Sequence, residues 1–225
     1  MTTMHGQPIL RRTIVGLAAT LSGAVTGVLI GSAIGVVEGN RMAPWIIARA
    51  TGISAYLLLV LLVLLGLLLS HPWRTRVARP SPATRIRLHI VLAALTLALT
   101  IAHIVVLGTD RFAGVGWRGA GLPMQSSYRP AAVTLGVLGA WAGIVVGSTA
   151  LLAGHLPRRL WWRVHKVAIV ALLLIWLHGV LAGGDTAMLR WLYLSTGGLI
   201  AVIALSRYVA RTPAEQIAHR ERGDR

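Results

Sequence analysis

The stretch IRLHIVLAALTLALTIAHIVVL, residues 86–107, is apolar almost throughout and is long enough to cross a membrane as one helix. A hydrocarbon core of roughly 30 Å needs about 20 helical residues. Five more stretches meet or approach this length, at 13–37, 46–69, 131–156, 167–181 and 189–209. The sequence therefore predicts an all-α, polytopic membrane protein, in which residues 13–209 form a bundle of six transmembrane helices.

Composition supports this class and removes several alternatives. Of the 225 residues, 56% are hydrophobic and 12% are charged, whereas soluble proteins average about 25% charged. The chain has no cysteine. This excludes disulfides, iron–sulfur ligation and the covalent attachment of a c-type haem.

The basic residues sort by side of the membrane. If the N-terminus is cytoplasmic, sixteen of the 22 Lys and Arg residues fall on the cytoplasmic side. The six on the other side are Arg41, Arg49, Arg111, Arg118, Arg129 and Arg190. By the positive-inside rule we expect both termini, residues 1–12 and 210–225, in the cytoplasm. The net charge of +16 then reflects topology, and no nucleic-acid partner is expected.

The first stretch, 13–37, follows a basic leader but is longer than the core of a secretory signal, so we expect a retained helix. Glycines recur every four residues in two of the stretches. They are Gly23, Gly27, Gly31 and Gly35 in the first and Gly139, Gly143 and Gly147 in the fourth. This spacing predicts close helix packing, and the alternative is room for a flat porphyrin. Residues 108–130 are predicted to form a long nonhelical outer loop.

Four histidines lie in or beside apolar stretches, His89 and His103 in the third and His165 and His178 around the fifth. A histidine in hydrocarbon costs free energy unless something binds it. A step of 14 residues places the first two rings about 40° apart around the helix and about 21 Å apart along it. The step of 13 residues in the fifth helix leaves its rings about 140° apart. We expect a π-bulge or kink there, eased by Gly179, unless the rings reach their partners from different flanks.

The third and fifth spans run in the same direction, which predicts how the histidines pair. His89 and His165 would meet near the cytoplasmic side, and His103 and His178 near the outer side. Two bis-imidazole sites stacked across a bilayer suit two noncovalent b-type haems, which would form a transmembrane wire for electrons. The alternative is that the histidines only hydrogen-bond to neighbouring helices.

Haem propionates are anionic, so we expect basic partners near the interfaces. The outer candidates, which break the inside bias, are Arg111, Arg118 and Arg129. Three more basic residues flank the inner pair: Arg85, Arg87 and Arg163. Topology and contact with lipid headgroups explain these residues at least as well as propionate binding does. His71 either faces the inner site or is an ordinary helix-end residue. No role is assigned to His5, His155 or His219.

This histidine pattern, on the third and fifth of six helices, resembles the ferric reductase-like transmembrane domain. That superfamily includes ferric reductases, NADPH oxidases and the bacterial membrane subunit MsrQ. The likeness covers residues 49–185. Its motifs are Arg49-Ala-Thr-Gly, Ser126-Ser-Tyr-Arg-Pro130, Leu160-Trp-Trp-Arg-Val-His165-Lys, and His178-Gly followed by Gly183-Gly-Asp185.

The resemblance implies that His89, His103, His165 and His178 are the axial ligands of two b haems. It implies the haem-binding membrane component of an oxidoreductase, in a bacterial plasma (inner) membrane. Ferric reductases and NADPH oxidases also carry a flavin and nicotinamide module, whereas no G-x-G-x-x-G follows a strand here. We therefore expect a separate electron donor, a cytoplasmic flavoprotein or a membrane quinol, so that any flavin or quinone belongs to a partner.

The sequence thus predicts transmembrane electron transfer to an external acceptor, either a ferric chelate or a periplasmic oxidoreductase. Histidines on both faces of each iron would leave no open coordination position, which favours outer-sphere transfer. The alternative class is a non-redox binding, structural or transporter-like membrane subunit. A proton or cation path normally uses intramembrane carboxylates, but Glu38, Asp110 and Asp185 fall at helix ends or in loops.

Overall fold

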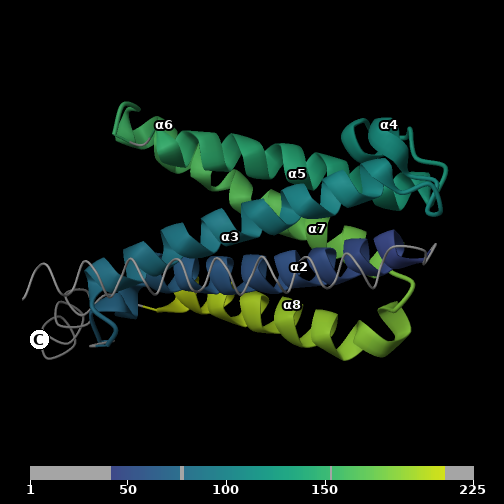
Figure 1. Ribbon diagram of the computed structural model, residues 1–225. Coiled ribbons are helices and arrows are strands. Elements are labelled where there is room, and N and C mark those ends of the chain that lie inside the picture. Colours follow the sequence, from purple (N-terminus) through teal and green to yellow (C-terminus); the bar gives the residue numbers. More distant parts are fainter. Residues whose placement is uncertain (1–41, 77–78, 153, 211–225) are drawn as a thin grey trace, which may run out of the picture. The chain divides into compact units, whose positions relative to one another are not determined.

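The computed structural model describes residues 42–76, 79–152 and 154–210, and helices are the only regular secondary structure over these residues (Figure 1). The chain divides into two compact units, residues 1–44 and 45–225. Apart from the first residues of one helix, everything described below belongs to the second unit. The predicted first span, 13–37, lies outside the described residues.

Helix α2, Ala43–Ser70, is followed by a short 3-10 helix, Pro72–Arg76, and by helix α3, Pro82–Thr109. Local sequence fixes the start of α3. The Ser81 hydroxyl accepts a hydrogen bond from the backbone N–H of Thr84 at 3.2 Å, and a proline takes the first helical turn. Both features satisfy or remove backbone donors that a helix start leaves unpaired.

Helix α4, Gly116–Gly121, is a short helix inside the segment predicted to be a nonhelical loop, 108–130. That prediction is wrong because tertiary contacts stabilise a glycine-rich turn of low helix propensity. The Trp117 ring lies directly against Gly108, where an added Cβ would come within 2.6 Å of it. Val115, which precedes α4, is buried at 5% exposure.

Helix α5, Pro130–Leu151, also begins with a proline. The predicted fourth span, 131–156, is too long, because His155 and Leu156 lie in turns beyond the helix. Gly154 and Pro157 explain the early end, since glycine favours helix termination and proline disfavours helical backbone in the residue before it.

The last three helices are α6, Arg158–His165, α7, Val167–Ala182, and α8, Thr186–Val209. Lys166 separates α6 from α7, and together they form one apolar span, Arg158–Ala182. The chain turns between α7 and α8 at residues 183–185, which include two consecutive glycines.

Five helical segments are long and apolar enough to cross a membrane: Ala43–Ser70, Pro82–Thr109, Pro130–Leu151, Arg158–Ala182 and Thr186–Arg207. The chain is therefore an all-α, multi-pass membrane protein whose helices contact lipid. These segments correspond to the second through sixth predicted spans. The cytoplasmic location of the termini stays a prediction.

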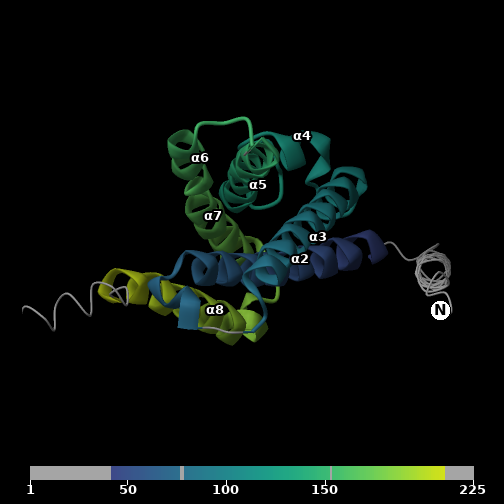
Figure 2. The same cartoon turned by 90° about the vertical axis from the view of Figure 1, so that its left-hand side faces the viewer.

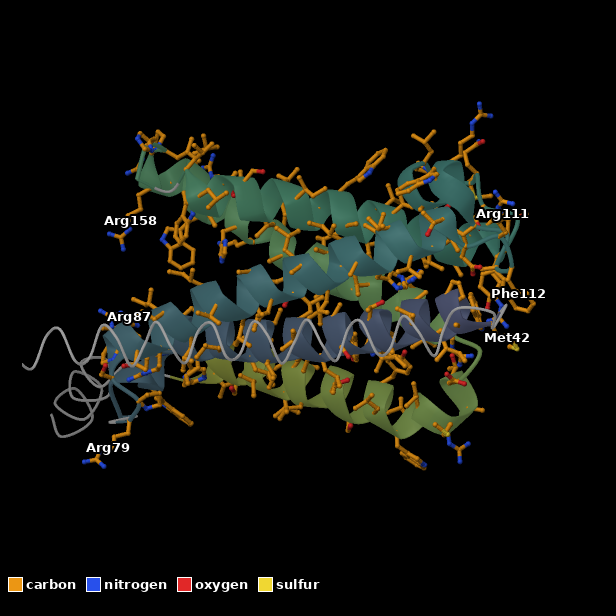
Figure 3. All side chains as sticks on the ribbon, in the orientation of Figure 1. Met42, Arg79, Arg87, Arg111, Phe112 and Arg158 are labelled. Carbon is orange, nitrogen blue, oxygen red and sulfur yellow. The ribbon has the colours of Figure 1, made fainter. Side chains whose placement is uncertain are left out.

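Charged side chains mark the two ends of the bundle (Figure 3). Arg79, Arg87 and Arg158 lie at one end, which is the predicted cytoplasmic side and is called the inner end below. Arg111 and Phe112 lie at the opposite end, which is called the outer end.

Helices α5 and α7 pack closely against each other (Figure 2). The contact depends on Gly139 of α5, where an added Cβ would lie 2.7 Å from Ile175 Cγ1 and 3.4 Å from the carbonyl oxygen of Ala171. Gly143 and Gly147 of the same ridge have no described atom within 4 Å of such a Cβ. The close packing predicted from the glycine spacing therefore applies at Gly139.

Two clusters of buried side chains hold the other helices. One joins Tyr56 and Val60 of α2 to Tyr193 of α8, and the other joins Val115 to Val133 of α5. Helices α3 and α7 do not pack closely backbone to backbone. Side chains must therefore bridge the space between them.

Replacing Gly139 with leucine is expected to lower the free energy of unfolding by about 1–3 kcal/mol, because the new side chain must displace Ile175. Thermal unfolding in detergent would show this as a lower Tm. The matched variant Gly143→Leu, on the same helix, should leave Tm nearly unchanged. An equal loss in both variants would contradict the role of Gly139.

Candidate functional site

The four histidines come together in two pairs. His89 of α3 faces His165 at the end of α6, with ring centroids 6.3 Å apart and ring planes at 58°. His103 of α3 faces His178 of α7, with centroids 6.4 Å apart and planes at 76°. These are the pairs that the parallel course of the two spans predicts. The first pair lies toward the inner end and the second toward the outer end, about 21 Å apart along α3.

The spacing within each pair fits two imidazoles that share one metal ion. With metal–nitrogen bonds of about 2.0 Å and a ring nitrogen about 1.1 Å from its ring centroid, the two centroids would lie about 6.2 Å apart. The observed separations are 6.3 Å and 6.4 Å. Rings in direct contact would not need to keep this distance.

In the outer pair, hydrogen bonds define which ring nitrogen is free. His103 Nδ1 lies 2.7 Å from the carbonyl oxygen of Ala48 in α2, and His178 Nδ1 lies 2.8 Å from that of Ala132 in α5. A carbonyl can only accept, so each Nδ1 carries the proton and donates it. The Nε2 lone pair of both rings is then available to a metal, an arrangement typical of metal-binding histidines.

A glycine makes each of these hydrogen bonds possible. Gly52 follows Ala48 by four residues, and Gly136 follows Ala132 by four, so each glycine lies beside the accepting carbonyl on the same helix face. A Cβ at Gly52 would lie 2.9 Å from His103 Cε1, and one at Gly136 would lie 2.7 Å from the Nδ1 of its histidine. Only without those atoms can the imidazole reach a carbonyl that already serves its own helix.

Helix α2 repeats this arrangement at the inner end in weaker form. A Cβ at Gly66 would lie 3.2 Å from His89 Cε1. The carbonyl of Leu62, four residues earlier, interacts with His89 but does not complete a hydrogen bond with its Nδ1. Gly52 and Gly66 are 14 residues apart, as are the two histidines of α3 that they contact. Sequence reasoning missed these glycines, although the shared spacing was a usable signal.

The 13-residue step between His165 and His178 is absorbed at Lys166, where α6 gives way to α7. The backbone N–H of Ile169 bonds to the Lys166 carbonyl at 3.1 Å, three residues back, as in a 3-10 turn. Such a turn advances about 120° per residue instead of about 100°, which reduces the expected offset between the rings. The distortion is therefore a tightened turn at Lys166. Of the two distortions expected, the structure has a local break in the helix and not a π-bulge, and Gly179 does not contribute to it because it lies in regular helix.

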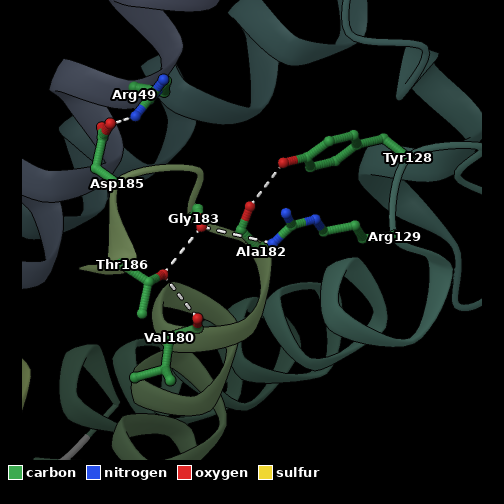
Figure 4. A network of polar contacts seen from close by, with 8 residues as sticks. All are labelled: Arg49, Tyr128, Arg129, Val180, Ala182, Gly183, Asp185 and Thr186. Atoms are coloured by element: carbon green, nitrogen blue, oxygen red, sulfur yellow. Dashed lines mark hydrogen bonds and ion pairs between the residues drawn. The ribbon is translucent and has the colours of Figure 1, made fainter. Parts of the chain in front are cut away.

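A mostly apolar cavity lies beside the outer pair. Its walls include His103, His178 and the glycines that they contact, and at the outer end of α2 it is lined by Trp45 and Arg49. Arg49 forms an ion pair with Asp185, which follows α7 (Figure 4). The cavity thus has imidazole nitrogens deep inside and a guanidinium group near its outer end.

The three arginines predicted to bind a cofactor are exposed, and none of them lines this cavity: Arg111, Arg118 and Arg129. The arginine that the structure brings to the cavity is Arg49. The sequence analysis placed Arg49 and Asp185 in two separate motifs but assigned neither a role, because their ion pair joins residues far apart along the chain.

Arg129 has a structural contact instead, at the C-terminus of α7 (Figure 4). Three side chains there donate hydrogen bonds to backbone carbonyls: Tyr128 to Ala182 at 2.8 Å, Arg129 to Leu181 at 2.7 Å and Thr186 to Val180 at 2.8 Å. They satisfy carbonyls that a helix end leaves unpaired. This fixes the end of α7 one turn beyond His178.

His71 is separate from both pairs. It is buried, and its Nδ1 accepts the backbone N–H of Trp73 at 3.1 Å, so its Nε2 donates to the hydroxyl of Ser206 in α8 at 3.2 Å. Nε2 joins the end of α2 to α8, and Nδ1 holds the 3-10 helix that follows α2. The interpretation as a helix-end residue is the one that the structure supports.

Over the described residues, no group of three or more His, Cys, Asp or Glu side chains comes together. Each histidine pair therefore offers two ligands of these types, and a metal bound there would need its other ligands from elsewhere. Comparison with protein-family models, curated proteins and solved structures finds no match to this chain. The site is thus argued from its own geometry.

Replacing His71 with leucine should lower the free energy of unfolding by about 1–3 kcal/mol, because Ser206 and the Trp73 N–H lose a buried partner. Thermal unfolding of His71→Leu and Ser206→Ala would measure this, with the smaller effect in Ser206→Ala. Any metal or cofactor bound at the histidine pairs should remain. If His71→Leu lost a bound group, His71 would belong to the histidine site, and its interpretation as a helix-end residue would be wrong.

Proposed function

We propose that this chain carries electrons across a membrane through two b-type haems, one held by His89 and His165 and the other by His103 and His178. The observation that carries the proposal is the matched spacing of the pairs, 6.3 Å and 6.4 Å between ring centroids. Each bound haem would supply a one-electron iron couple and the four equatorial nitrogens that the protein does not.

The outer site supports this proposal most fully. Carbonyl hydrogen bonds hold the Nδ1 protons of His103 and His178, which orients both rings and directs Nε2 toward a shared metal. The cavity beside them has mostly apolar walls, and near its outer end it is lined by Arg49 and by Asp185, which form an ion pair. Apolar walls suit a flat apolar group, and an anionic propionate would have to share Arg49 with Asp185.

The two histidines of each pair would both hold the iron of a bound haem, so the chain's own residues would bind, orient and insulate the group, which would supply outer-sphere electron transfer. The apolar surroundings of these half-buried rings would limit the access of water and competing reactants. The two sites lie toward opposite ends of the bundle, which suits transfer between partners on opposite sides of a bacterial inner membrane. The donor is a cytoplasmic flavoprotein or a quinol, and the acceptor is a ferric chelate or a periplasmic oxidoreductase. Exposed Arg111 and Arg118 at the outer end suit an anionic acceptor.

Within this proposal the chain is the haem-binding membrane component of an oxidoreductase of the ferric reductase-like kind. The non-redox alternative, a binding, structural or transporter-like subunit, accounts for the hydrogen bonds of His103 and His178 to neighbouring helices, but not for the matched spacing of the two histidine pairs. The acidic side chains among the described residues are Asp110 and Asp185, and both lie at helix ends. Asp110 accepts hydrogen bonds from two backbone N–H groups and turns the chain after α3.

The purified full-length protein, expressed with haem available, should contain two b haems per chain. A dithionite-reduced minus oxidised spectrum identifies them, and a pyridine haemochrome assay counts them. Four variants then test the pairing: His89→Ala and His165→Ala should lose the same haem, and His103→Ala and His178→Ala the other. If protein expressed with haem available contained none, the proposal would be wrong and the non-redox alternative would be favoured.

The glycines offer a second test that leaves every histidine in place. Gly52→Val should abolish the outer haem, because its Cβ would occupy the position of the His103 ring. Gly66→Val should instead weaken the inner haem, since the same change there meets His89. The two variants control for each other, and haem-resolved spectra measure the outcome. Loss of the same haem in both would be incompatible with the arrangement on α2.

A further inference from the structure

The two histidine pairs are held in different ways. In the outer pair each Nδ1 donates to a backbone carbonyl. In the inner pair, His89 Nδ1 and His165 Nδ1 are both buried without a hydrogen-bond partner. His89 still rests against Gly66. His165 Nδ1 bonds to no carbonyl, and among the described glycines none has the His165 ring as a nearest neighbour, so something else must fix the plane of this imidazole.

Trp161 meets this requirement. It precedes His165 by four residues, which places the two side chains on the same face of α6. Their rings are stacked, with centroids 5.0 Å apart and planes only 17° apart. Trp162 touches the same imidazole only edge-on, at 6.5 Å and 82°, and its side chain is exposed.

Stacking places the Trp161 ring over a whole face of the imidazole, whereas a hydrogen bond holds only one of its nitrogen atoms. Two parallel rings in contact gain dispersion and electrostatic stabilisation beyond their buried area, and the Trp161 side chain is half-buried. Trp162 lies beside this stack, with its ring centroid 4.8 Å from that of Trp161 and the planes at 66°.

We propose that Trp161 is the positioning residue of the inner pair, holding the plane of His165 by stacking where the outer pair uses carbonyls. The nature of the metal group that benefits rests on the proposed function, but the contact itself does not. Trp161 acts through its ring rather than its N–H, because its Nε1 is buried without a partner. Phenylalanine should therefore replace it and leucine should not.

The first test needs no haem. Full-length protein produced without haem is treated with diethyl pyrocarbonate, and modification of His165 is followed by peptide mass spectrometry. Trp161→Leu should speed modification of His165 several-fold, because the unstacked ring can turn and bring a ring nitrogen to the reagent. Trp161→Phe and the matched neighbour variant Trp162→Leu should stay close to the parent rate, as should His103 in every variant.

The second test uses haem-loaded protein and its ferric electron paramagnetic resonance spectrum, which senses the relative orientation of two axial imidazoles. Trp161→Leu should broaden or shift the signal of the inner haem and leave the outer signal unchanged, with recovery in Trp161→Phe. Trp162→Leu should change neither signal.

The proposal is overturned if Trp161→Leu leaves both the modification rate and the inner signal unchanged. It is equally overturned if Trp162→Leu reproduces its effects, because a general disturbance of α6 would then be the cause. Protein that binds no haem would defeat the proposed function alone, since the modification rates still decide whether Trp161 holds His165.

Discussion

A buried imidazole must use its ring nitrogens on partners, and in this bundle the partner of the outer rings is the backbone of another helix. Helical carbonyls already accept from their own helix, yet each oxygen has a second lone pair. Side chains four residues later normally cover that lone pair, so glycine at that position uncovers it. His103 over Ala48 and Gly52, and His178 over Ala132 and Gly136, both depend on this device.

The arrangement divides labour among the helices. Helices α3, α6 and α7 supply the rings, while α2 and α5 supply the carbonyls and the space that the rings require. Close packing of α5 on α7 at Gly139, together with side-chain caps on the end of α7, holds His178 against its acceptor. These contacts hold α7 away from α3, and the side chains of His103 and His178 extend into the space between the two helices.

Hydropathy and histidine spacing were enough to predict the five described spans and both histidine pairs, because these features depend on composition and on helix direction. Other features depend on contacts between residues distant in the chain. Neither the ion pair of Arg49 with Asp185 nor the hydrogen bonds of His71 leaves a local pattern. The tightened turn at Lys166 was anticipated as a distortion from the 13-residue step, but its place and kind depend on how α6 joins α7.

The glycines of α2 have a consequence for how this chain can change in length. Gly52 and Gly66 are separated by the same 14 residues as the histidines of α3, and the two helices run in opposite directions. A single alignment of α2 on α3 therefore places Gly52 against His103 and Gly66 against His89. Inserting or deleting one residue between the glycines would rotate one of them by about 100° and shift it by about 1.5 Å. The interval in α2 can therefore vary only together with the interval in α3, which makes these two helices a single unit of length variation.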